Sequence, residues 1–122
     1  MALNILDILN MNGGLCMLKV DLDMKVKFLH GFAHKTRIQI LECIKEKEKT
    51  VSHIVEALNG NQSNISQHLA CLKGCGLIVG RQEGKYTYYS LRNQQIRELL
   101  NMFDVVFEQV EGDVACCDRH IG

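Results

Sequence analysis

The sequence predicts a small, mainly α-helical domain that carries a single β-hairpin. Apolar residues recur at helical spacing along most of the 122-residue chain, which indicates helices with one buried face. Residues 77–91 differ, because β-branched and aromatic residues lie on either side of Glu83-Gly84, and a glycine can adopt the positive φ of a tight turn. A helical domain with one two-stranded hairpin is therefore expected.

The composition favours one domain in a reducing compartment. The chain is 47% hydrophobic and 23% charged, and no apolar run reaches the length of a membrane span. Its first residues, MALNILDILNMNGG, lack the basic start and the cleavage site of a secretory signal, which predicts a cytoplasmic location. In that compartment the six cysteines favour metal binding, redox chemistry or packing over disulfides.

Five helices are expected before the hairpin. The first three are a short segment around residues 3–9, a helix from Asp21, and one that ends before the charged run 45–49. Thr50 can cap the fourth helix, which Asn59-Gly60 ends after little more than two turns. The fifth follows after a tight turn, so a helix-turn-helix is predicted.

The fifth helix, within NQSNISQHLACLK, combines a narrow apolar stripe with a face of small polar residues. Ile65, Leu69 and Leu72 recur at i, i+4 and i+7 and are expected to face the core. Amide and hydroxyl side chains on the opposite face can bond base edges or phosphates, and small residues let a helix enter the major groove. A solvated polar face is the alternative.

The hairpin that follows carries basic residues near its turn. Residues 61–92 hold four basic residues against one acidic residue, a net charge of +3, although the whole chain is neutral. A basic hairpin after a candidate recognition helix is the arrangement of a winged helix, whose wing meets the DNA backbone or the minor groove. A solvated hairpin without a partner is the alternative. The residues predicted to contact DNA are Gln62, Ser63, Asn64, Ser66, Gln67, Lys73, Arg81 and Lys85.

The chain is expected to end in a helix and a flexible tail. Apolar residues recur at helical spacing over residues 92–110, and the sequence EGDVACCDRHIG follows. A winged helix-turn-helix domain is therefore expected over residues 1–110, with a flexible C-terminal tail over residues 111–122. The apolar stripes of the first and last helices are the expected surface of a homodimer, which would match a two-fold site in double-stranded DNA.

Three blocks of the sequence resemble the ArsR/SmtB repressors. AHKTRIQILECI, SNISQHLACLKGCGLI and RQEGKYTYYSL occur in the order of that family within residues 24–92. The sequence departs from the family at His34-Lys35, where many members have Asp-Pro. The resemblance implies a winged-helix homodimer that represses transcription by binding operator DNA when metal-free and that releases the DNA when metal binds.

Cys71 and Cys75 stand four residues apart near the end of the fifth helix. On a continuous helix their Cβ atoms would lie about 6 Å apart, close enough for two thiolates to share one soft metal ion. Gly74, between them, can end the helix and loosen that spacing. Two ligands hold a metal poorly, and Cys116 and Cys117 of the tail are the expected further donors. The alternative is that neither cysteine binds metal: Cys71 would then be a small core residue, and Cys75 a thiol that lies at the helix end by chance.

Within the family, SNISQHLACLKGCGL is most similar to the CmtR-like cadmium and lead sensors. This resemblance implies that Cys71 and Cys75 bind metal with one tail cysteine of the other subunit, and either Cys116 or Cys117 can fill that place. It implies Cd(II) or Pb(II) as the inducer, ahead of Zn(II) or As(III), and target genes for metal efflux or detoxification. The scarcity of well-placed imidazole and carboxylate also weighs against zinc.

The other cysteines and the histidines are weaker candidates for metal ligands. Cys43, between apolar neighbours, is expected to be a buried thiol, whereas Cys16, in a flexible glycine-flanked stretch, can join a site. His120 can assist the tail cysteines. Packed or solvated roles are expected for the remaining histidines, His30, His34, His53 and His68.

Two other functions stay open at this point. A repressor of the same fold could sense oxidants, which needs cationic groups beside a thiol, and Lys73 and Arg119 are near in sequence. A small metal-carrying or thiol-exchange protein could use Cys116, Cys117 and His120 without binding DNA. No Ser/His/Asp set, phosphate-binding loop or paired-carboxylate motif indicates an enzyme.

Overall fold

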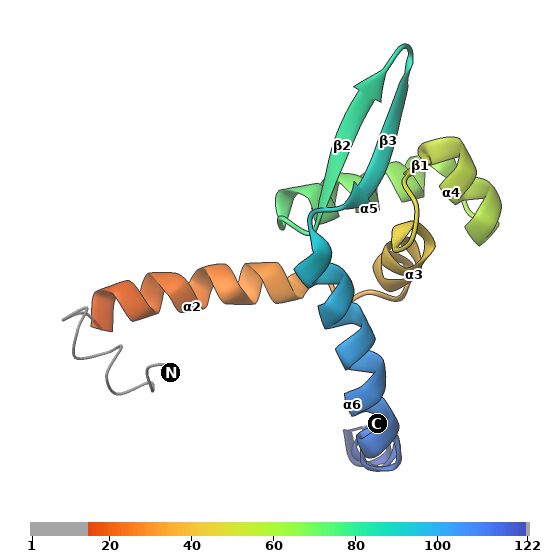
Figure 1. Cartoon of the computed structure of the whole chain (residues 1–122). Coiled ribbons are helices and arrows are strands. Elements are labelled where there is room, and N and C mark those ends of the chain that lie inside the picture. Colours follow the sequence, from red (N-terminus) through yellow and green to blue (C-terminus); the bar gives the residue numbers. More distant parts are fainter. Residues whose placement is uncertain (1–14, 122) are drawn as a thin grey trace.

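The computed structural model describes the backbone of residues 15–121 and the side chains of residues 21–113. It is a helical domain with one prominent hairpin (Figure 1), so the predicted fold class is confirmed. The helix expected around residues 3–9 lies outside the described residues. In chain order the elements are α2 (Leu15–His30), α3 (Lys35–Ile44), β1 (Lys49–Thr50), α4 (Val51–Leu58), α5 (Gln62–Gly74), β2 (Ile78–Glu83), β3 (Tyr86–Leu91) and α6 (Gln94–Ile121).

One apolar core joins α3, α4 and α5 to the base of the hairpin and the first turns of α6. The stripe predicted for α5 is confirmed, because Ile65, Leu69 and Leu72 are all buried. Fully buried aliphatic side chains in such a core each stabilise the fold by about 1.5–3 kcal/mol. The core residues are Ile40, Leu41, Ile44, Ile54, Ile65, Leu69, Leu72, Leu77, Ile78, Ile96 and Leu100.

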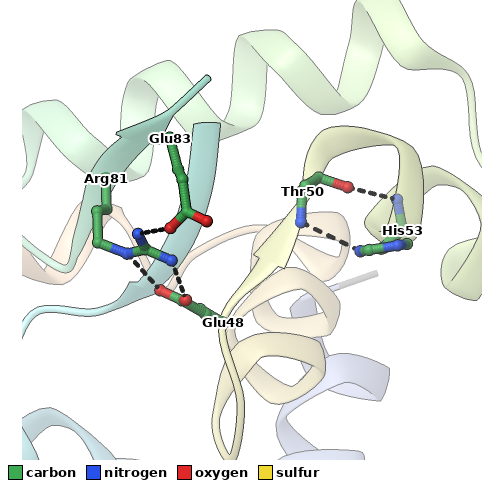
Figure 2. A network of polar contacts seen from close by, with 5 residues as sticks. All are labelled: Glu48, Thr50, His53, Arg81 and Glu83. Carbon is green, nitrogen blue, oxygen red and sulfur yellow. Dashed lines mark hydrogen bonds and ion pairs between the residues drawn. The ribbon is translucent and has the colours of Figure 1, made fainter. Parts of the chain in front are cut away.

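Helices α4 and α5 form the predicted helix-turn-helix, and a side-chain cap defines the N-terminus of each helix. Thr50 Oγ1 accepts a hydrogen bond from the backbone N–H of His53 at 3.3 Å, and the imidazole of His53 accepts one from the N–H of Thr50 at 3.5 Å (Figure 2). Asn59 ends α4 in the left-handed conformation, with φ of 52°. Asn61 then caps α5 by accepting from the N–H of Asn64 at 3.0 Å.

Strands β2 and β3 form the predicted hairpin, here called the wing. The turn is Gly84-Lys85, one residue later than expected, because Glu83 pairs with Tyr86 and so belongs to β2. Gly84 supplies the positive φ, at +62°. Strand β1 adds to β3 in a three-stranded antiparallel sheet of order β1-β3-β2. No sequence pattern predicts β1, because two residues are too few to show alternation.

Helices α2 and α6 project from the body of the domain, as Figure 1 shows. Phe32, just after α2, packs edge-to-face on Phe103 of α6, with ring centroids 5.0 Å apart. Helix α2 begins at Leu15, earlier than the expected Asp21, so the backbone at Cys16 is helical. Large apolar side chains on both helices stay exposed, among them Leu22, Met24, Val26, Leu29, Met102, Val105, Val106, Phe107 and Val110.

Helix α6 continues through residue 110, the predicted domain boundary, to Ile121. The expected tail therefore has helical backbone over residues 111–121, and no proline interrupts it. The division into a domain and a tail stays a prediction. Within residues 15–121, no helix is both long and apolar enough to cross a membrane.

Candidate DNA-binding surface and thiol pair

The outward face of α5 presents the polar side chains that the sequence assigns to DNA. All five side chains of the first turns are exposed: Gln62, Ser63, Asn64, Ser66 and Gln67. At 100° per residue, Ser63 and Gln67 point away from the buried stripe. Asn64 and Ser66 lie on its flanks, and Gln62 lies beside it. Lys73 is exposed in the last turn. Unlike Asn61, which caps the helix, these side chains are free to meet base edges or phosphates.

The two basic residues of the wing differ in their surroundings. Lys85, in the turn, is exposed, with Nζ 5.5 Å from the centroid of the Tyr86 ring. Arg81 instead lies between Glu48 and Glu83 and forms ion pairs with both carboxylates (Figure 2). Hydrogen bonds from Arg81 lower the pKa of Glu48, and the two carboxylates raise the pKa of Arg81. Two carboxylates of the protein itself therefore offset the positive charge of Arg81.

Cys71 and Cys75 stay on one helical turn despite Gly74. The N–H of Cys75 donates to the carbonyl of Cys71 at 2.9 Å, and Cys75 keeps near-helical angles, with φ of −83° and ψ of −4°. The chain leaves the helix only at Gly76, where φ is +82°. Both thiols are half-buried. Burial first, and the neighbouring Cys71 thiol second, raise the pKa of Cys75.

Arg37 of α3 joins the thiol pair to the end of α2. Its Nη1 donates to Cys71 Sγ at 3.3 Å, and its Nη2 donates to the carbonyl oxygen of His30 at 3.1 Å. Sequence reasoning did not single out Arg37. No local signal could have found it, because it lies 34 residues before Cys71 and reaches that thiol only through the packing of α3 on α5.

The thiol pair fits a thiophilic metal ion, but only as part of a site. Two neighbouring sulfurs are soft donors that suit such an ion. Among the described side chains, no cluster of three or more His, Cys, Asp or Glu residues forms around them. Cys116 and Cys117 lie on α6 and Cys16 lies on α2, but their side chains are outside the described ones, as is that of His120.

The described histidines take local structural positions. His53 completes the cap of α4, and His34 caps α3 by accepting from the N–H of Thr36 at 3.1 Å. The His34 and His68 rings lie 4.3 Å apart between centroids. Burial first, and then electrostatic interactions with His34 and Arg37, lower the pKa of His68.

Cys43 is half-buried and packs against the core. Burial raises the pKa of its thiol.

Known proteins resemble both the sequence and this arrangement. Residues 34–79 match the family described as bacterial regulatory protein, arsR family. The regulator CmtR of Mycobacterium tuberculosis is 32% identical over 86 residues, which cover 70% of this chain and 73% of that protein. The chain belongs to the arsR family. A probable mercury resistance operon repressor of Streptomyces lividans is 29% identical over 97 residues, which cover 80% of this chain and 78% of that protein.

Solved structures of arsR-type proteins share the fold. The homodimeric winged helix-turn-helix DNA-binding domain of Mb0332 from Mycobacterium bovis, a possible ArsR-family regulator, has a TM-score of 0.75 at 28% identity, covering 80% of this chain and 90% of that one. The cadmium sensor CmtR from Mycobacterium tuberculosis has a TM-score of 0.57 at 30% identity, covering 63% and 80%.

Membership makes this arsR-family protein a DNA-binding transcriptional regulator rather than an enzyme. It also argues against the thiol carrier that does not bind DNA.

Proposed function

We propose that this arsR-family protein is a homodimeric repressor that binds operator DNA when metal-free and releases it when Cd(II) or Pb(II) binds. The observation that carries this function is the position of Cys71 in the last turn of α5 and of Cys75 at the C-cap of the same helix. The same helix presents the polar face from Gln62 to Gln67. An ion that draws the two thiols toward further ligands therefore acts directly on the element that would read DNA.

The DNA-binding half of the proposal is supported by exposure and charge. The polar face of α5 and Lys85 of the wing are exposed, and the segment that contains them carries an excess of positive charge. Two copies related by two-fold symmetry would place two such helices in successive major grooves. The exposed apolar faces of α2 and α6 would hold the two copies together.

The metal-binding half is supported by the donor set. Cys71 and Cys75 would supply two thiolates, and Cys116 or Cys117 of the partner subunit a third. Thiolates suit Cd(II) and Pb(II), and also As(III) and Zn(II), but no carboxylate or imidazole among the described side chains completes a site typical of a zinc sensor. CmtR, which shares this fold, is a cadmium sensor.

Metal and DNA would then oppose each other through one helix. The dimer geometry that favours a closed metal site would displace α5 from the spacing that the operator requires. Coupling of this kind is reciprocal, so the operator must weaken metal binding by the same factor by which metal weakens operator binding.

A titration of the operator-bound protein tests this function. Cd(II), Pb(II), Zn(II) and As(III) would be added in turn, while fluorescence anisotropy reports DNA release and ultraviolet absorption reports thiolate–metal bonds. Release that follows the absorption for Cd(II) or Pb(II) supports the proposal. Thiolate absorption without release, or no binding of any two-fold duplex by the metal-free protein, would refute it.

Arg37 favours one second candidate, a redox-sensing repressor of the same fold. A guanidinium 3.3 Å from Cys71 Sγ is the kind of cationic neighbour that such a sensor needs. Peroxide should then release the operator without metal, and a thiol reductant should restore binding. Retention of DNA under peroxide, together with release by Cd(II), would reject this candidate.

A further inference from the structure

Arg81 lies in a network that ties the wing to the body of the domain. Its Nε donates to Glu48 Oε2 at 3.2 Å, its Nη2 pairs with the other oxygen of the same carboxylate, and its Nη1 pairs with Glu83 (Figure 2). Glu48 lies between α3 and β1, 33 residues before Arg81. The contact therefore joins strand β2 to a segment outside the hairpin.

The network is exposed, but it joins one guanidinium to two carboxylates, one of them through two contacts. Isolated exposed pairs contribute little to stability, whereas bidentate arginine–carboxylate pairs within a network hold a defined orientation. The guanidinium carbon of Arg81 also lies 5.0 Å from the centroid of the Tyr88 ring. Arg81 is thus held by two carboxylates and one aromatic ring.

Strand alternation puts Arg81 on one face of the wing and the start of α5 on the other. Arg81 pairs with Tyr88 and Gln82 pairs with Thr87, so the two pairs point to opposite faces. Thr87 lines a surface hollow of about 260 Å³ together with Gln62 of α5. The side chain of Arg81 therefore points away from this hollow.

The chemistry of the hollow suits an anion. Lys85, Ser52 and Gln62 lie at its wall and supply an ammonium, a hydroxyl and an amide. Among the described residues that line it, none is a carboxylate. A hollow of about 510 Å³ beside Tyr88 differs, because Glu48 and Glu56 line it together with Lys47 and Lys49, so it offers a mixture of charges.

We propose, on the basis of the function proposed above, that Arg81 is a positioning residue and that Lys85 is the DNA-contacting cation of the wing. Held by Glu48 and Glu83, Arg81 fixes the angle of the wing. Lys85 then lines the hollow together with Ser52 and Gln62, and a backbone phosphate of the operator binds in this hollow.

The dependence of operator affinity on salt separates the two roles. A lysine that neutralises one phosphate contributes about 0.9 to the slope of log affinity against log salt concentration. Lys85→Gln should reduce the slope by about that amount for each subunit. Arg81→Gln should weaken binding by roughly twofold to fivefold, as expected for loss of an exposed ion pair, and leave the slope unchanged. A slope that falls in Arg81→Gln as it does in Lys85→Gln would overturn the proposal.

Glu48→Gln should change operator affinity in opposite directions for the two possible roles of Arg81. If Arg81 positions the wing, the variant should weaken operator binding as much as Arg81→Gln does, and the double variant should bind no more weakly than either single one. If Arg81 contacts DNA, freeing it from Glu48 should strengthen binding. Glu46→Gln is the matched control, since it removes an exposed carboxylate from the same segment without touching Arg81.

Wing mobility tests the same contact without DNA. NMR order parameters of the backbone amides of residues 79–90 should fall in Arg81→Gln and in Glu48→Gln and stay at the parent value in Lys85→Gln. Parent-like order parameters in the first two variants would overturn the positioning role. A parent protein that binds no duplex would instead refute the repressor function, and the order parameters would still decide whether Arg81 holds the wing.

Discussion

Individual side chains set the properties of the thiol pair on α5. Arg37 donates to Cys71, and the Nε atom of the same guanidinium is buried without a hydrogen-bond partner among the described residues. The two Nη atoms hold the guanidinium between the Cys71 sulfur and the carbonyl of His30, so Arg37 helps to orient that sulfur. A residue that orients a metal ligand commonly changes metal affinity by 10–100-fold when it is removed.

Replacement of Arg37 by methionine should therefore weaken Cd(II) binding by about tenfold or more. Methionine keeps much of the length and apolar contact of the arginine stem but removes both donors. Competition with a chelator, followed by thiolate–cadmium absorption, would measure the change, and thermal unfolding would report stability. Equal Cd(II) affinity in a folded Arg37→Met variant would show that the Arg37 contact has no influence on the site.

The Cys71→Ser and Cys75→Ser variants should bind operator like the parent but should not release it with Cd(II) or Pb(II). Serine preserves the volume of cysteine but replaces a soft thiolate with a neutral hydroxyl, which is a poor ligand for these ions. Anisotropy of a labelled operator during metal titration is the measurement. Cys43→Ser is the control, because Cys43 packs against the core, and its metal response should match the parent's.

His68 should make the folded state sensitive to acid. Its folded pKa is lowered from 6.5 by burial first, and then by electrostatic interactions with His34 and Arg37. The unfolded chain therefore binds more protons between the folded pKa and 6.5, so the contribution to stability is complete above 6.5 and is lost as the pH falls toward the folded pKa. Chemical denaturation above and below pH 6.5 should show that His68→Gln loses less free energy of unfolding on acidification than the parent does. An equal loss would contradict this assignment.

At the scale of elements, the helix-turn-helix is short, and side-chain caps determine where its two helices begin. Helix α4 has only eight residues, and Thr50 is both its cap and a member of strand β1. Thr50 is also buried, with 7% of its surface exposed. The start of α4 and the edge of the sheet are thus fixed by one residue.

Thr50→Ala should lower the free energy of unfolding by about 1 kcal/mol, the usual cost of a lost cap. Thr50→Ser keeps the hydroxyl that accepts from the N–H of His53, so it should recover most of that loss. Denaturant titrations of the three proteins would measure the difference. A Thr50→Ser variant as unstable as Thr50→Ala would assign the effect to the methyl group and to packing instead of the cap.

At the scale of the whole molecule, α2 and α6 carry exposed apolar faces that extend beyond the core. A second copy covering these faces would bring α6 of one subunit near the partner, and with it the tail cysteines. The proposed metal site therefore depends on whether Cys116 or Cys117 serves its own subunit or the other one.

Mixed dimers should distinguish these two arrangements. One subunit would carry Cys71→Ser and Cys75→Ser, and the other would carry Cys116→Ser and Cys117→Ser. If the tail crosses to the partner, one complete site survives, formed by the intact α5 and the intact tail of opposite chains. If the tail serves its own subunit, neither chain can complete a site. Metal stoichiometry from thiolate absorption, with two ions expected in the parent dimer, would reveal which holds.

Deletion of residues 112–122 is the companion experiment. It should weaken metal binding and reduce thiolate absorption for each bound ion, while operator affinity stays close to the parent's. Undiminished metal binding would remove Cys116 and Cys117 from the site.

The sequence by itself determined the fold class, the helix-turn-helix, the wing and the spacing of Cys71 and Cys75, because each depends on local periodicity, caps and turn residues. Only the tertiary structure decided the partners of those elements. The contacts of Arg37 with Cys71 and of Arg81 with Glu48 span 34 and 33 residues, and β1 pairs with β3 across α4 and α5. Such contacts depend on how separate elements pack, and a pattern confined to neighbouring residues carries no information about that packing.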